Sequence, residues 1–343
     1  MANLTDHQLV AGPEAVAYGT KAATFRSFEM LSKSSIAWDQ KPIQGAGLRP
    51  ARNFPRADRR KPGYGQGKPV ISIEAVTTGM GTLLNACLGN GQSTLVPGEG
   101  STTYQQLYSS GLGGTVLPSL TAQLGIVRSD DTGTVDPYTL RGCTVSDWSI
   151  ECPSAEKLIL EATLDALALD TDTALVEWED PAYTGFYTSW AGSVSLGGTI
   201  TPPTATALAT GGSPLAEVRN WKLSVANKID DSGWVVGGRR RPRFGARTAT
   251  FEAEVYYVDQ TFVDALREQT PVGIVIAHTA GSLSTGLETL QLCVPAFLVD
   301  DGAIPDPTDD GAPTVAKLKT TVALDADDDE AFYVACRTAD TAI

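Results

Sequence analysis

Histidine is scarce in this sequence. The 343 residues include two histidines, His7 and His278, and a Ser-His-Asp triad or a Cys-His pair would have to use one of them. His278 ends an apolar, strand-like run, which favours a structural role, and His7 lies close to the N-terminus. The nucleophile turn G-x-S-x-G and the phosphate loop G-x-x-x-x-G-K-[ST] are both absent. We therefore expect no catalytic site and no cofactor, and we predict that the protein is not an enzyme.

The cysteines do not indicate a disulfide framework or a zinc site either. The five cysteines are odd in number, and no two of them have the C-x-x-C spacing of a zinc or redox motif. We expect buried, free thiols in a reducing compartment and no metal site. The cysteines are Cys87, Cys143, Cys152, Cys293 and Cys336.

Long apolar runs and a surplus of positive charge are also missing. The best apolar runs, such as 272–277, have the length of a strand, whereas a membrane-spanning helix needs about 20 residues. Residues 1–14 lack a basic start followed by an apolar stretch, so we expect no secretory signal and synthesis in the cytoplasm. The net charge of −14 argues against a nucleic-acid reader, because such a protein must neutralise phosphates.

What the sequence does contain is short strand-like segments between turns rich in its 34 glycines and 20 prolines. Segments 70–76, 220–229 and 250–258 alternate apolar and polar residues with period two, which is typical of strands with one buried face. Segment 157–169 alternates too, and we favour a strand over a helix there. These patterns predict a mainly β fold.

Two short helices interrupt this pattern. The segment 78–88 places Met80, Leu83, Leu84 and Cys87 at helical spacing and is followed by Gly89, a natural C-terminal cap. The second helix is expected over 260–269, with Asp259 as its N-terminal cap.

Other stretches resemble loops or arms. Segment 41–68 is basic, holds four prolines and has no clear period, and segment 199–214 reads as a surface connection. Segment 300–313 is an acidic linker. Beyond it, 319–324 and 331–336 are expected to form a C-terminal hairpin.

A weak internal repeat organises the middle of the chain. Residues 145–150 resemble 218–223, and 160–164 resemble 251–255. Chance similarity between amphipathic strands is the alternative. A true repeat predicts two hairpins, near 141–169 and 218–258, that give four strands with one polar face. Such a unit is suited to one sector of a large closed barrel, in which strand edges pair between subunits.

The two basic segments allow three interpretations: docking on the acidic surface of the next copy, a plain solvated loop, or nucleic-acid binding. We favour the first, because few aromatic residues accompany the charges and the rest of the chain is acidic. The candidate contact residues are Arg49, Arg52, Arg56, Arg59, Arg60 and Lys61 in one segment, and Arg239, Arg240 and Arg241 in the other.

The order of these patterns resembles the tail tube proteins of siphophages, which have long non-contractile tails. The resemblance runs from about Gly12 to Cys336. It is carried by Gly12-Pro13-Glu14 to Thr20, Phe25 to Glu29, Gly47-Leu48-Arg49-Pro50, the strand 71–76, Thr78 to Gly89, and segments 221–227, 247–257 and 262–270. The chain departs from the family in the Gly-, Ser- and Thr-rich stretches 89–101 and 199–214.

The resemblance implies a β-sandwich or barrel-type fold whose hairpins close into a barrel between subunits of a hexameric ring. Rings would stack into a tube that surrounds the tape measure protein, meets tail terminator and baseplate or tip proteins, and conducts DNA without binding it specifically. It implies a virion protein with no membrane partner.

The chain would then be one domain, 1–343. It comprises an N-terminal arm with the first strands (1–37), a long basic inter-ring loop (38–69), the β core (70–299) and an acidic linker with a C-terminal hairpin (300–343).

Carboxylates on the repeated hairpins are candidates for the tube lumen, where like charge discourages DNA from adhering. They are Asp147, Glu151, Glu161 and Asp165 in the first hairpin and Glu252 and Glu254 in the second. Alternatively, these side chains face outward or pair with the arginine loops. Two other functions stay open: a surface adhesin or receptor-binding β-protein, and a carboxylate-dependent hydrolase.

Overall fold

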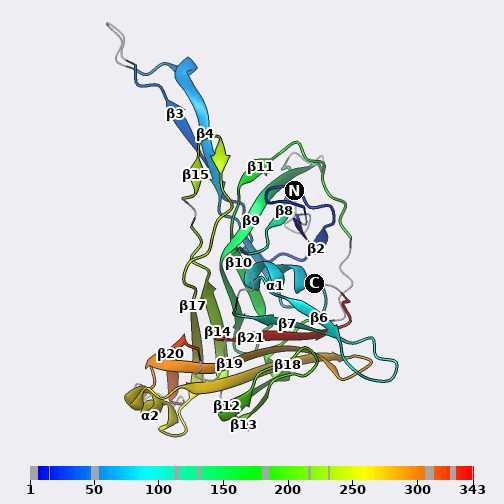
Figure 1. Cartoon of the computed structure of the whole chain (residues 1–343), viewed down its shortest axis with the longest axis vertical. Coiled ribbons are helices and arrows are strands. Elements are labelled where there is room, and N and C mark those ends of the chain that lie inside the picture. The colour runs from blue at the N-terminus through cyan, green and yellow to red at the C-terminus, as the bar shows by residue number, and fades with distance from the viewer. Residues whose placement is uncertain are drawn as a thin grey trace.

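The computed structural model describes residues 7–14, 16–47, 54–111, 116–129, 133–179, 185–214, 218–230, 232–305, 313–324, 330–341 and 343. Figure 1 shows an elongated molecule: a body of strands, a narrow arm projecting from one end, and the helix α2 at the opposite end. The predicted mainly β class with two short helices is confirmed. Within the described residues the sheets do not close into a barrel in a single chain.

A central antiparallel sheet runs through the body. Its strands are, in spatial order, β5 (Val70–Glu74), β10 (Ile159–Asp165), β9 (Val135–Cys152), β14 (Val218–Ala226), β17 (Thr248–Tyr256) and β20 (Val315–Val322). Segment 157–169 therefore contains a strand, as predicted, and not a helix.

Further strands extend this sheet at both ends of the body. Next to β20 lies the long β19 (Leu287–Asp301). On one side, β19 pairs with β18 (Val272–Ser282), which is followed by β12 (Gly192–Thr201) and β13 (Thr210–Pro214). On the other side, β19 pairs with β21 (Tyr333–Thr338), which is followed by β7 (Tyr104–Ser109) and β6 (Gln92–Leu95). The first half of β9 pairs with β11 (Ala168–Asp170) and β8 (Leu120–Val127), which continues to β1 (Gln8–Pro13) and β2 (Arg26–Phe28).

The period-two pattern of the sequence explains how the central sheet packs. Along β17, Ala249, Phe251, Ala253 and Val255 are buried, while the residues between them face outward. The rings of Trp221 on β14 and Phe251 lie 6.5 Å apart in the core. Burial of such apolar faces supplies most of the driving force for folding, and the sheets share one continuous core.

Both predicted helices are present, slightly shorter than expected. Helix α1 (Gly81–Leu88) is mostly buried and ends at Gly89, whose φ of 92° suits a glycine cap. The guanidinium of Arg247 donates to the carbonyls of Cys87 and Leu88 at 3.3 and 3.4 Å, which satisfies orphan carbonyls of the last turn. The N-terminal cap of helix α2 (Thr261–Glu268) is Gln260 and not the predicted Asp259, which lies one residue earlier and whose Oδ1 accepts a hydrogen bond from the Thr261 amide at 2.9 Å.

Two segments that were predicted to be loops contain strands in the structure. The basic segment is a β-hairpin of β3 (Trp38–Gln44) and β4 (Arg60–Gly67), with the short 3-10 turn η2 (Ala57–Arg59) before β4. Segment 199–214 contains the end of β12 and all of β13, so only its middle is a connection.

The predicted C-terminal hairpin was wrong in its pairing. Its strands exist as β20 and β21, yet each pairs with β19: β20 with residues 297–301 and β21 with 289–293. The two strands pair with different stretches of the long β19 and therefore not with each other.

The cysteine prediction is confirmed: all five are free and buried. Burial raises the pKa of the Cys152 thiol to about 11 and that of Cys336 to about 12. The thiolate is the reactive form of cysteine, so these side chains are inert in the folded protein.

His278 on β18 is held in a neutral, hydrogen-bonded position. Its ring is buried, with Nδ1 2.9 Å from the carbonyl oxygen of Thr188, and Trp221 Nε1 donates to Nε2 at 3.2 Å. A carbonyl only accepts, so Nδ1 carries the proton and Nε2 accepts. Burial lowers the pKa of His278 below the ordinary 6.5. This geometry fits a structural role near the short turn η3 (Ser189–Ala191).

The stability of the protein should therefore depend on His278 below pH 6.5. The unfolded chain takes up a proton near that pH while the folded state resists it, so the free energy of unfolding falls as the pH drops through this window, by at most about 1.4 kcal/mol per pH unit. His278→Gln should be less stable at neutral pH but lose this component. Urea unfolding of both proteins above and below the window measures the difference, and equal pH dependence would contradict the assignment.

Candidate functional site

The two repeated hairpins pair in the same register. In the first, Trp148 of β9 lies opposite Ala162 of β10; in the second, Trp221 of β14 lies opposite Ala253 of β17. These are the positions that the sequence repeat equates. The loop between the strands differs greatly in length, but the paired segments are equivalent.

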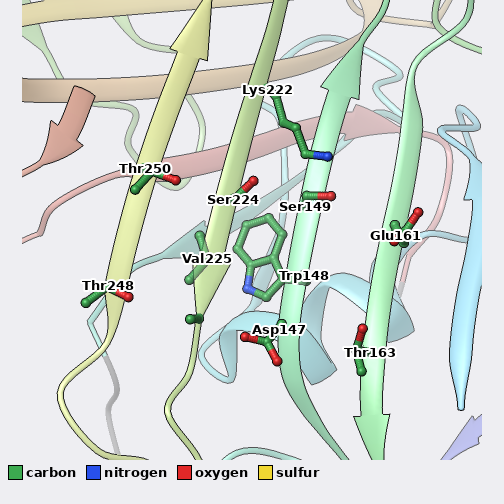
Figure 2. A pocket seen from close by; sticks show the side chains of 11 residues that line it. Asp147, Trp148, Ser149, Glu161, Thr163, Lys222, Ser224, Val225, Thr248 and Thr250 are labelled. Carbon is green, nitrogen blue, oxygen red and sulfur yellow. The ribbon is translucent and has the colours of Figure 1, made fainter. Parts of the chain in front are cut away.

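The hairpins also lie side by side, because β9 pairs with β14. Ser149 lies opposite Ser224, which joins β10, β9, β14 and β17 into one four-stranded unit. Its outward side, here called the polar face, presents short hydroxyl side chains and charges over a hollow of about 240 Å³. Figure 2 shows the labelled side chains on the four neighbouring strands: Glu161 and Thr163, Asp147, Trp148 and Ser149, Lys222, Ser224 and Val225, and Thr248 and Thr250.

Lysines are interleaved with the carboxylates of the polar face. Lys222 Nζ lies 2.9 Å from Glu151 Oε2, and Lys222 also stands opposite Glu252 across the strands. Lys33, from the segment after β2, reaches Glu161 at 3.4 Å and Glu151 at 4.0 Å. Two of the predicted lumen carboxylates are thus partly neutralised, a feature that sequence reasoning missed.

The remaining carboxylates are more open. Asp147 and Glu252 are exposed, while Glu254 accepts from Asn220 at 2.9 Å and lies 3.9 Å from Arg219. On the four strands the polar face carries Asp147, Glu151, Glu161, Glu252 and Glu254 against Arg219 and Lys222. The face is hydrophilic and moderately acidic, with its charges largely in ion pairs.

Asp165 does not belong to this face, which corrects the prediction. Its side chain is 2% exposed and forms an ion pair with Arg239, whose side chain is 0% exposed. Arg239 Nη1 donates to Asp165 Oδ1 at 3.1 Å, and Gln66 Nε2 donates to the same oxygen at 2.7 Å. The prediction of Arg239 as a contact to another copy is corrected for the same reason: a buried guanidinium has no surface to offer.

These contacts fix the base of the projecting hairpin, here called the arm (the described residues 38–47 and 54–67). Strands β15 (Trp234–Val235) and β16 (Gly238–Arg239) form a small second hairpin beside it, as Figure 1 shows for β15. The rings of Tyr64 and Trp234 lie 4.4 Å apart, and the Arg239 guanidinium lies 5.2 Å from the Trp234 ring. The sequence offered no signal for this junction, because its members come from three distant segments.

The other predicted contact residues fall into three groups. Arg49 and Arg52 lie outside the described residues. Arg56, Arg59, Arg60 and Lys61 are exposed at the far end of the arm, and Arg240 is exposed on the second hairpin. Arg241 is engaged within the chain: it donates to the Leu117 carbonyl and lies over the Tyr18 ring.

One local ion pair reduces the charge of the arm. Arg56 Nε donates to Asp58 Oδ1 at 2.7 Å, and this hydrogen bond lowers the pKa of the Asp58 carboxyl. The arm nevertheless keeps a basic surplus near its end, since Arg59, Arg60 and Lys61 are all exposed.

Removing one partner of the buried pair should destabilise the protein strongly. Asp165→Asn leaves the Arg239 guanidinium desolvated without its counter-charge, and breaking such pairs costs about 3–5 kcal/mol. Arg240→Met, next along the chain but exposed, should change stability by less than about 0.5 kcal/mol. Urea unfolding of both variants tests this, and an Asp165→Asn variant as stable as the parent would show that the pair is dispensable.

The fold and these surfaces define a structural β-protein with an extended polar sheet face and a basic arm. Among the described residues, no three His, Cys, Asp or Glu side chains are grouped so that they could hold a metal ion. In the same residues, no helix has the length and apolar character needed to cross a membrane.

Comparison with known families identifies the chain more closely. A family model described as phage tail tube protein matches residues 5–326. The chain therefore belongs to the phage tail tube protein family, and it is a structural subunit of a phage tail tube and a component of the virion. Membership in a structural family implies a non-enzymatic role. No curated protein matches the sequence.

Proposed function

We propose that six copies of this chain form a ring in which the polar faces of β10, β9, β14 and β17 join into the inner wall of a continuous barrel. The observation that carries this proposal is the four-stranded unit of two equivalent hairpins with a wholly outward, polar side. Barrel closure between copies removes exposed strand edges. The sixfold number rests on the resemblance to siphophage tail tubes.

Stacked rings would form a non-contractile tube. It encloses the tape measure protein during assembly in the host cytoplasm, ends on tail terminator and baseplate or tip proteins, and conducts DNA at ejection. The hydroxyl side chains and the neighbouring opposite charges suit this role, because the cations of the face lie beside carboxylates and leave little free positive charge to hold phosphates.

Lumen placement can be tested by cysteine labelling. All native cysteines are buried, so Glu252→Cys provides a single exposed thiol on the polar face. In assembled tubes it should react with a small maleimide but not with a maleimide linked to a bulky protein. Unassembled protomers of the same variant, which serve as the control, should react with both. Equal labelling of tubes by the two reagents would place this face outside.

The arm is the proposed bridge between rings. Reversing Arg56, Arg59 and Arg60 to Glu should leave a folded protomer, because the side chains are exposed, but should abolish or shorten tubes in negative-stain electron micrographs. The matched variant with Lys at the three positions keeps the charge and should assemble. Normal tubes from the Glu variant would refute the bridge, and dispersed parent protein at every concentration would instead favour the adhesin alternative.

A further inference from the structure

An apolar groove lies at the end of the molecule opposite the arm. It has a volume of about 310 Å³ and lies where β17 runs into α2, beside the middle of β12 and the end of β13. Figure 1 shows α2 at the end of the molecule opposite the arm. Its lining includes Leu196, Pro214, Tyr256, Tyr257, Val258 and Phe262. Val258 is 68% exposed and both tyrosines are more than one-third exposed. Grouped exposed apolar side chains of this kind mark interaction surfaces.

The surroundings of the groove are acidic. Helix α2 packs on the end of β19, where the Gln269 side chain donates to the Val299 carbonyl at 3.4 Å. Around this contact the two segments expose five carboxylates: Asp259, Asp264, Glu268, Asp300 and Asp301. Arg267 pairs with Asp264 and Glu268 at 3.1 Å, and Asp301 stands opposite Lys319 of β20, so the carboxylates still outnumber the cations.

The far end of the arm has the complementary character. Gln44 pairs with Arg60 where β3 ends and β4 begins, so the described residues 45–47 and 54–59 lie at its tip. Phe54 is 88% exposed there, and Ile43, beside the tip, is 65% exposed. Arg56 and Arg59 are exposed close by. A large aromatic side chain surrounded by cations is a common anchor in protein interfaces.

We propose that the groove beside α2 is the receptor for the arm tip of a second copy of this chain, with Phe54 seated among Tyr256, Tyr257 and Val258 and the arm arginines facing the carboxylates of α2 and β19. Both apolar character and charge match, and the two surfaces lie at opposite ends of the long axis. A head-to-tail contact between unlike surfaces generates an open stack and not a closed pair. The inference rests on the proposed stacking of rings and names the surface that receives the arm.

Disulfide trapping tests this contact. In a protein carrying Phe54→Cys and Val258→Cys, both new thiols are exposed, and the native cysteines are buried. The two positions are too far apart within one chain to link, so oxidised tubes should give ladders of linked oligomers that collapse on reduction. A mixture of the two single variants should give dimers only. The control pair is Phe54→Cys with Val16→Cys, which is equally exposed but lies on the N-terminal side of the body; it should not link.

The outcomes separate this inference from the tube itself. If the double variant forms tubes but no 54–258 link, or if the control pair links, the groove is not the receptor although the tail tube role stands. If the parent protein forms no tubes, the proposed stacking of rings is contradicted, and with it the inference that rests on it. As a second measurement, Phe54→Ala should raise the protein concentration needed for tube formation by roughly tenfold or more. Val16→Ala should leave it unchanged, and an unchanged concentration for Phe54→Ala would overturn the anchor.

Discussion

The buried ion pair between Asp165 and Arg239 connects the two parts of the molecule that a tube subunit needs. Asp165 ends β10 in the sheet that carries the polar face, Arg239 belongs to β16, and Gln66 of the arm donates to the same carboxylate. A desolvated carboxylate is stable only with such partners in place, so the three segments must come together in one arrangement. The direction of the arm is therefore tied to the sheet and not left to a flexible loop. If the arm contacts another copy as proposed, this pre-organisation lowers the entropic cost of assembly.

On the polar face, lysines reduce the repulsion between carboxylates of neighbouring strands. A row of unpaired carboxylates repeated around a ring would repel DNA, but it would also repel the neighbouring strands that carry it. Lys222 between Glu151 and Glu252, and Lys33 above Glu151 and Glu161, reduce this internal repulsion. Hydroxyl side chains fill the row between these charges. The resulting surface is polar, with carboxylates and cations side by side, and it suits the proposed passage of DNA better than the acidic lumen expected from the sequence.

The sequence predicted those elements that bury one face. Strands β14 and β17 and helix α1 were found because burial forces a regular apolar period. The arm was taken for a loop because both sides of β3 and β4 face solvent, so no period exists to be read. The partners of a strand were harder to predict from the sequence than its position. Strands β20 and β21 are neighbours in sequence, yet long-range contacts with β19 decide their partners. For the same reason Asp165, which alternates in phase with Glu161, could not be distinguished from an exposed carboxylate.

The placement of charge along the molecule agrees with the proposed head-to-tail stacking. If both ends of the subunit were basic, or both acidic, every ring would repel the next; the net charge of −14 makes this a real constraint. The cations lie on the arm and the carboxylates lie beside α2. With the same net charge, the arm of one copy is therefore attracted to the α2 end of another copy, while like ends repel each other. Screening at physiological salt limits this attraction to about 8 Å, so it acts when the arm tip is already near its receptor. An apolar anchor such as Phe54 must then supply the affinity, while the charges determine which end it meets.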